Sequence, residues 1–187
     1  MQASNRTIRI GVSSCLLGEH VRYDGKDSTN TYITDILSQN FELAGFCPEV
    51  GIGMGVPRAP IQVTLVGDHQ RVLGVADHGL DVTDALKRYA MEVSERLNTV
   101  SGYIFKTRSP SCGLGNVEIY DLQGECVERG TGIYAQIITG LLPDLPVIDE
   151  EALMKADKRE HFIRRVNEYH RLCSRTGSRT GSRTGLR

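Results

Sequence analysis

The sequence predicts an α/β fold of the Rossmann-like kind: a mostly parallel sheet with helices on both faces, plus small hairpins. Three observations support this prediction. Strand-like apolar runs alternate with segments of helical apolar spacing, and two further segments alternate polar and apolar residues around a turn. The chain has 187 residues, enough for one core of about 150 residues. We therefore expect one main domain.

The strands and helices are expected in alternating order along the chain. Three strand-like runs are TIRIGV at 7–12, FELAGF at 41–46 and SGYIFK at 101–106. Helical spacing of apolar residues marks the segments 28–40, 81–98, 132–142 and 150–172. Hairpins are expected at 61–75 and 117–130. Alternation of this kind predicts parallel pairing between the strands.

Composition divides the chain into three parts. We assign an α/β domain to residues 1–150 and a basic amphipathic helix to 151–173. Residues 174–187 repeat the motif SRTG. We expect this low-complexity tail to be disordered, because it lacks the apolar residues that offset the entropy of ordering.

The charge distribution bears on the class of ligand. The formal net charge is −1, and the tail carries four arginines and no acid, so the rest of the chain is mildly acidic. General binding of polyanions depends on clustered Lys and Arg, so a small-molecule substrate fits better. The sequence contains neither a run of about 18 apolar residues nor an apolar signal-peptide core. We expect a cytoplasmic protein that does not enter a membrane.

Three of the five cysteines follow predicted strands. Cys15, Cys47 and Cys112 come shortly after the strands at 7–12, 41–46 and 101–106, whereas Cys126 and Cys173 do not. The carboxyl ends of parallel strands share one edge of a sheet, so we expect these three thiols to lie close together. The alternative is that each thiol is a small buried apolar side chain, as free cysteines often are.

Three clustered thiols restrict the chemistry of the site. Structural zinc normally has four ligands with closely spaced pairs, and this pattern is absent. Thiolates also suit copper(I) and iron-sulfur clusters, and a cubane cluster normally takes four cysteines. With three, one iron would keep an open coordination position. The neighbouring glycines Gly11, Gly18 and Gly113 are expected to let the backbone approach such a group.

Three motifs carry a resemblance to a known family. They are IGVSSCLLGEHVRYDG at 10–25, CPEVGIGMGVPRAP at 47–60 and KTRSPSCG at 106–113. In this order and spacing they strongly resemble the thiouracil desulfidase (TudS) family, over about residues 7–148. The resemblance implies a hydrolytic, non-redox desulfuration that replaces the thiocarbonyl sulfur of a thiolated pyrimidine, such as 2-thiouracil or 4-thiouridine, by oxygen and releases hydrosulfide.

The resemblance also implies a set of site residues. Cys15, Cys47 and Cys112 would hold a [4Fe-4S] cluster with one open iron. Glu49 and Ser109 match the family's catalytic positions. Glu49 would deprotonate water or protonate the ring, and Ser109 would contact the base or orient the water. The alternative for Glu49 is an ordinary loop acid, and for Ser109 it is turn formation.

Four charged residues complete the expected site. Arg22 and Asp24, in the VRYDG segment, are expected at the mouth of the site, and Arg58 and Lys106 are expected to position the substrate. The alternative for the last two is that their charges are simply solvated.

Other functions stay open at this stage. The resemblance extends to a subgroup whose longer members continue into a second domain and act on 4-thiouridine in transfer RNA. Transfer RNA is thus the alternative partner to a small thiolated nucleobase or nucleoside. An iron-sulfur sensor or electron-transfer protein, an enzyme with one nucleophilic cysteine and an RNA-binding module are further alternatives.

Overall fold

The fold contains a four-stranded parallel sheet, as the sequence predicts. A computed structural model describes residues 7–176. The sheet has the order β2-β1-β5-β8, and each neighbouring pair is parallel. Its strands are β1 (Arg9–Ser13), β2 (Glu42–Phe46), β5 (Tyr103–Phe105) and β8 (Val147–Asp149). The predicted α/β class is confirmed.

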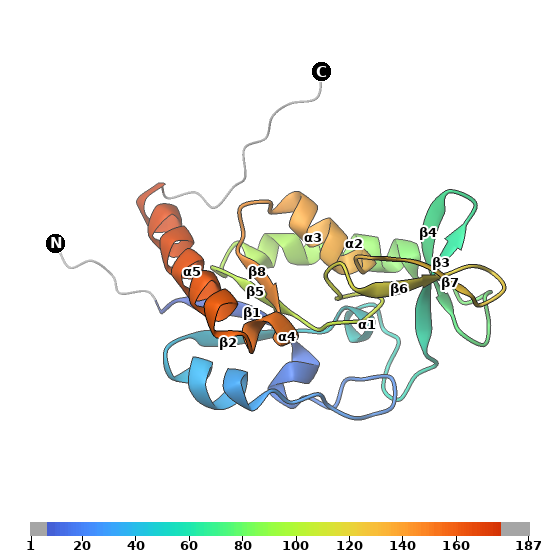
Figure 1. Cartoon of the computed structure of the whole chain (residues 1–187), viewed down its shortest axis with the longest axis horizontal. Helices are drawn as coiled ribbons and strands as arrows, with labels where there is room; N and C mark the ends of the chain where they lie inside the picture. The colour runs from blue at the N-terminus through green and yellow to red at the C-terminus, as the bar shows by residue number, and fades with distance from the viewer. Residues whose placement is uncertain (1–6, 177–187) are drawn as a thin grey trace, which may run out of the picture.

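Helices cover both faces of this sheet. On one face, α2 (Thr83–Leu97) and α3 (Ile133–Leu141) lie side by side and pack against Phe46, Tyr103 and Phe105 (Figure 1). The opposite face carries α5 and shorter helical segments, which pack against Ile10 and Val12 of β1 and their neighbours. These are η1 (Ser14–Leu17), η2 (Tyr32–Ile36), η3 (Leu37–Gln39), α4 (Glu150–Leu153) and α5 (Ala156–Thr176).

The two predicted hairpins exist, and they join into a second sheet. Its order is β4-β3-β6-β7, with β3 and β6 parallel and both hairpins antiparallel. The strands are β3 (Ile61–Val66), β4 (His69–Gly74), β6 (Val117–Tyr120) and β7 (Cys126–Gly130). This sheet lies at the end of the molecule opposite α5 (Figure 1). Leu86 of α2 and Ile133 of α3 pack on it, so the two helices link both sheets.

The C-terminal segment forms two helices where the sequence predicted one. Asp149 accepts a hydrogen bond from the Ala152 N–H and caps α4, which ends at Leu153 before α5 begins at Ala156. Ser174 and Arg175 belong to α5, so its last residues include the start of the predicted tail. Residues 177–187 lie outside the described residues. Within the described part of the chain, none of the helices combines the length and apolar character needed to cross a bilayer.

The first turn of α3 holds the loop that contains Cys112. The N–H groups of Gly132, Ile133 and Ala135 donate to the carbonyls of Gly113, Pro110 and Ser111, at 2.9, 3.2 and 3.0 Å. These bonds satisfy helix donors that have no partner within the helix. The loop and the helix approach closely, since a Cβ on Gly132 would lie 2.5 Å from Ser111 backbone atoms.

Substitution of Gly132 tests this close packing. We expect Gly132→Ala to lower the free energy of unfolding by about 1–3 kcal/mol, the usual cost of overpacking. Gly140→Ala is the matched control, because a Cβ on Gly140 of α3 would have no neighbouring atom within 4 Å, and alanine there is expected to be neutral or stabilising by up to about 1 kcal/mol. Denaturant unfolding compares the two variants. Equal stability of both would contradict the close approach.

Candidate functional site

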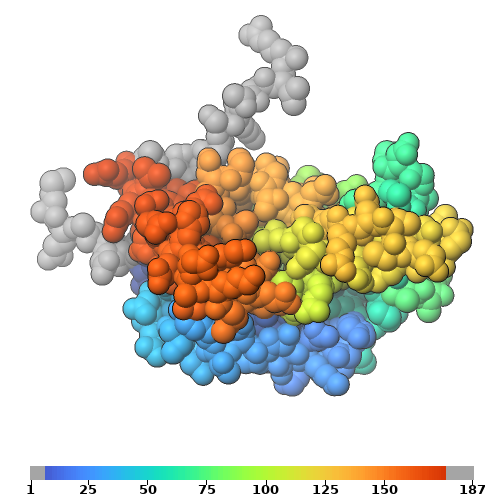
Figure 2. Space-filling view, viewed as in Figure 1, coloured from blue at the N-terminus to red at the C-terminus, as the bar shows by residue number. Residues whose placement is uncertain are grey.

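The three predicted cysteines line one cleft. β2, β1 and β5 are neighbours and run parallel, so the segments after them leave the sheet at one edge. Cys15 lies in η1, Cys47 directly follows β2, and Cys112 lies in the loop after β5; all three line a cleft of about 630 Å³. On the face shown in Figure 2, the yellow-green 106–113 loop borders the blue N-terminal segment, and parts of both line this cleft.

The cysteines of the described residues that line the cleft are Cys15, Cys47 and Cys112. Within residues 7–176, no three His, Cys, Asp or Glu side chains are placed to hold one ion together. A cubane cluster presents a different iron to each cysteine, so its ligands need not converge on one point. Cys126, on the exposed surface of β7, and Cys173, in α5, do not line the cleft. The cleft therefore offers three thiols and no fourth.

Without a metal, the three thiols are held in the neutral form. Burial raises the pKa of Cys15 to about 11 and that of Cys47 to about 12, and it raises the pKa of Cys112 well above its ordinary value. The negative charge of Glu49 adds to each of these increases. Binding of iron by thiolates would therefore release protons and would be opposed by low pH.

Glu49 and Ser109 meet in the same cleft. Glu49 lies in α1 (Pro48–Gly51), just after Cys47, and is only 8% exposed. The Ser109 hydroxyl donates to Glu49 Oε1 at 3.5 Å, and the Cys47 thiol donates to Glu49 Oε2 at 3.5 Å. Ser109 Oγ also accepts the N–H of Cys112 at 3.1 Å. Ser109 thus forms the turn that presents Cys112 and contacts the carboxylate.

The predicted charged residues differ in their placement. Arg22, Arg58 and Lys106 line the cleft, whereas Asp24 is exposed and does not. Asp24 forms an ion pair with Arg22 Nε at 3.4 Å, so its contact with the lining of the cleft is through that arginine. Arg58 is anchored by donating to the Val21 carbonyl at 2.8 Å.

Comparisons with known proteins point to one family. The sequence profile described as 2-thiouracil desulfurase matches residues 10–150. The chain belongs to this family. A solved structure described as a [4Fe-4S]-dependent thiouracil desulfidase, TudS, has a TM-score of 0.59 and 30% identity, over 79% of this chain and 93% of that chain. No curated protein sequence matches the chain. The resemblance inferred from the three motifs is confirmed.

In this member of the 2-thiouracil desulfurase family, two buried residues beside the cysteines escaped the sequence analysis. Ser13 is 3% exposed, and its hydroxyl accepts the Lys106 N–H at 3.1 Å. Ser13 also forms a hydrogen bond with Cys112. That bond lowers the pKa of the Cys112 thiol, but burial raises this pKa by more. Glu150 is 9% exposed and bonds both Lys106 and Thr107. The position of Ser13 within the first motif was the one sequence feature, and a weak one, that could have indicated its place in the site. Glu150 lies 35 residues or more from all three motifs and carries none.

Tyr23 also lines the cleft, although the sequence offered no reason to single it out. It lies in the VRYDG segment, lines the cleft and is 47% exposed. Its carbonyl accepts the Arg58 N–H at 2.9 Å, which ties the first and second motifs together. An aromatic ring at the cleft mouth offers a surface on which a planar base can stack.

Gly11 and Gly113, two of the glycines near the cysteines, are packed closely against neighbouring side chains. A Cβ on Gly11 would lie 2.5 Å from the Tyr103 ring, and one on Gly113 would lie 2.3 Å from a Val117 methyl group. Neither glycine lines the cleft. Gly18 has φ of 90°, a backbone conformation that favours glycine, at the end of η1. Gly11 and Gly113 thus have a packing reason for being glycine, and their approach to a cluster stays a prediction.

Thiol modification tests the electrostatics of the metal-free cleft. At pH 7 we expect iodoacetamide to modify the exposed Cys126 first and Cys15 and Cys47 much more slowly, because burial raises the pKa of the last two to about 11 and 12. Their thiolate fraction, and hence their rate, should rise about tenfold per pH unit below those values. Peptide mapping by mass spectrometry between pH 7 and 9 measures the rates.

The Cys126→Ser variant is the control and should remove the early product. If Cys15 or Cys47 reacted as fast as Cys126 at pH 7, the site would contain an activated thiol, and the alternative of a single nucleophilic cysteine would gain support.

Proposed function

We propose that this protein is a [4Fe-4S]-dependent desulfidase that replaces the thiocarbonyl sulfur of a thiolated pyrimidine by oxygen and releases hydrosulfide. The observation that carries the proposal is the convergence of Cys15, Cys47 and Cys112 on one cleft beside the buried Glu49. Membership of the 2-thiouracil desulfurase family and 30% identity to a [4Fe-4S]-dependent thiouracil desulfidase support it.

The cleft residues fit the proposed cofactor. Cys15, Cys47 and Cys112 would hold the cluster through their sulfur atoms, and no fourth cysteine lines the cleft. When bound, a cluster with one iron free of protein ligands would supply a Lewis acid that prefers a soft thiocarbonyl sulfur. The five cysteines are all free, which agrees with the proposed cytoplasmic location.

We assign to Glu49 the transfer of protons in the exchange of sulfur for oxygen. Water must lose a proton as its oxygen bonds to the ring carbon, and the carbon-sulfur bond breaks as sulfur leaves with its electron pair. Glu49 Oε1 accepts this proton and can return it to the ring nitrogen or the departing sulfur. The second proton of the water leaves the oxygen as the carbonyl forms, so that water and thiocarbonyl give carbonyl, hydrosulfide and one proton released to solvent. The Ser109 hydroxyl, donating to the same oxygen at 3.5 Å, orients the carboxylate and can turn toward the base or the water.

The size of the cleft favours a small substrate. Its volume of about 630 Å³ falls within the usual range of about 300–1,000 Å³ for small-molecule sites. We propose a free thiolated nucleobase or nucleoside, with Arg22 and Arg58 contacting its polar edge. Transfer RNA that contains 4-thiouridine is the second candidate.

The activity is tested by anaerobic reconstitution with iron and sulfide. The loaded protein is given 2-thiouracil, 4-thiouridine and 4-thiouridine-containing transfer RNA, and hydrosulfide and the oxygenated base are measured. We expect release of hydrosulfide from at least one small compound. Turnover of transfer RNA alone would move the assignment to RNA. Stable iron binding without turnover would favour a sensor or electron-transfer protein.

Cysteine substitutions test the proposed cluster ligands. We expect Cys15→Ser, Cys47→Ser and Cys112→Ser each to reduce iron content from about four atoms per chain to below about one, because each removes one of three anchors. The control Cys126→Ser should keep full iron content and the thiolate-to-iron absorbance. Loss of the cluster in this control would disprove ligation by the three cleft cysteines alone.

Substitution of Glu49 separates catalysis from cluster binding. We expect Glu49→Gln to lower kcat by about 10²- to 10⁴-fold, since the amide cannot accept the proton, with iron content unchanged. Glu125→Gln is the control, because Glu125 is exposed on the β6-β7 hairpin and does not line the cleft. Steady-state rates and iron analysis on the same samples measure both effects. An unchanged rate in Glu49→Gln would remove Glu49 from the catalytic set.

A further inference from the structure

β8 is an edge strand of the parallel sheet. In the order β2-β1-β5-β8 it lies last, with β5 as its only strand neighbour among the described residues. The Pro146 carbonyl accepts the Tyr103 N–H at 2.9 Å and so points toward β5. Backbone groups of successive residues in a strand point to opposite sides, so the N–H and carbonyl of Val147 point away from β5. The outer edge of β8 therefore presents a donor and an acceptor.

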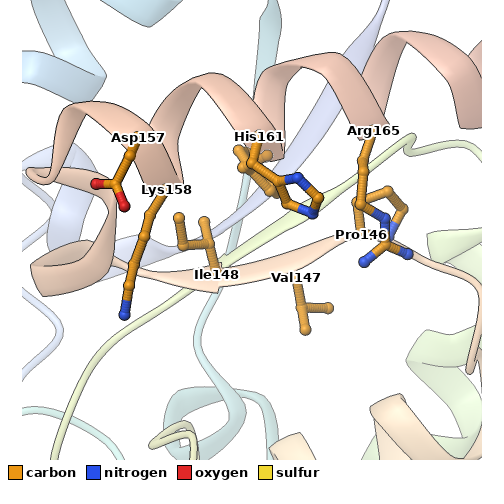
Figure 3. Close-up of a pocket in the computed structure, with 8 residues that line it drawn as sticks. Pro146, Val147, Ile148, Asp157, Lys158, His161 and Arg165 are labelled. Atoms are coloured by element: carbon orange, nitrogen blue, oxygen red, sulfur yellow. The ribbon is translucent and has the colours of Figure 1, made fainter.

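A cavity lies along this edge and beneath α5. It has a volume of about 440 Å³ and is lined by Pro146, Val147 and Ile148 together with side chains of α5. Consecutive strand residues point to opposite faces, so a cavity that touches all three must lie against the edge of the strand. Figure 3 shows Lys158, His161 and Arg165 extending from α5 toward β8.

The wall formed by α5 is predominantly basic. Lys158, His161 and Arg165 line the cavity at intervals of three and four residues, which places them on one side of the helix, and Asp157 is the one acid among the lining residues. Arg164, adjacent to this set, donates to His161 Nδ1 at 3.0 Å and adds a further cation. This charge contrasts with the mildly acidic character of the rest of the chain before residue 150.

We propose that this groove binds an extended acidic peptide segment of another protein, which pairs with β8 as an added strand. The backbone of the segment bonds the N–H and carbonyl of Val147, and its acidic side chains face Lys158 and Arg165. The donor and acceptor on the outer edge of β8 are the groups that an added peptide strand pairs with. Phe162, buried between the helix and the sheet, and Ile148 provide the apolar base of the groove. This site is independent of the proposed desulfidase activity.

A peptide of alternating sequence provides the test. The blocked peptide Ac-Glu-Val-Glu-Val-Glu-NH2 is titrated into the full-length protein, with affinity measured by calorimetry and the Val147 amide followed by NMR. We expect binding at micromolar to millimolar concentrations with a shift of the Val147 signal, and no binding of Ac-Lys-Val-Lys-Val-Lys-NH2. Absence of binding by the acidic peptide, or equal binding by the lysine peptide, would overturn the proposal.

Backbone methylation separates strand addition from simple charge attraction. In an added strand all glutamate N–H groups point to one side and all valine N–H groups to the other. We expect N-methylation of one of these two sets of N–H groups to abolish binding, and N-methylation of the other set to leave binding unchanged. If both methylated peptides bound like the parent, the peptide would not pair with β8. Tighter binding of a single-stranded oligouridylate than of the acidic peptide would assign the groove to RNA.

Charge reversal on α5 locates the contact. We expect the double variant Lys158→Glu, Arg165→Glu to weaken binding of the acidic peptide by at least about tenfold, because it places like charges opposite each other. The double variant Arg171→Glu, Arg175→Glu is the matched control on the same helix, since it changes the net charge equally and both arginines are exposed and do not line the groove. Thermal unfolding verifies that both variants fold. If the control weakened binding of the acidic peptide equally, the net charge of the protein, and not this groove, would govern binding.

Discussion

The parallel pairing of β1 on both of its sides is the constraint on which the site depends. β1 pairs with β2 through Ser13 and Phe46 and with β5 through Val12 and Ile104. A slip of one residue would move every side chain to the opposite face. It would also replace Gly11, which leaves room for the Tyr103 ring, by a residue with a Cβ. The register therefore fixes the level at which all three strands end, and with it the positions of the segments that carry the cysteines.

The second sheet and α3 stabilise the most irregular of these segments. The loop between β5 and β6 has Arg108 at φ of 57°, a conformation that costs free energy for residues other than glycine. Its carbonyls accept N–H groups from the first turn of α3, and Ser109 closes its turn onto Cys112. Because α2 and α3 pack on both sheets, the second sheet and the Cys112 loop are both held by the same helix α3.

Local sequence signals predicted much of this arrangement, whereas contacts between distant segments were not predictable. Alternating strands and helices indicated the parallel sheet, and strand-end positions indicated that Cys15, Cys47 and Cys112 approach one another. The joining of two hairpins through β3 and β6 could not be predicted, because parallel pairing of strands some 50 residues apart leaves no local pattern. The contact between Glu150 and Lys106 likewise has no sequence signal, since a surface acid and a buried one look alike in sequence.

The contact between Glu150 and Lys106 changes the interpretation of the cations in the cleft. Glu150 accepts hydrogen bonds from Lys106 Nζ, the Thr107 N–H and the Thr107 hydroxyl, so this buried ion pair has the additional bonds that offset the cost of desolvation. The charge of Lys106 is thereby held in a fixed position.

The cations in the cleft also act on the cysteines. Burial is the largest influence on the pKa of Cys15, and Lys106 is the next largest and lowers it. Arg58 lowers the pKa of Cys47. Both effects favour the thiolate that a metal requires and oppose burial and Glu49, which favour the thiol. The cations predicted to position substrate thus have a second role that does not need substrate. They offset part of the free-energy cost of forming thiolates next to a buried carboxylate, whereas the close approach of Glu49 to Cys47 is itself explained by the neutral thiol, which donates to Glu49 Oε2 at 3.5 Å.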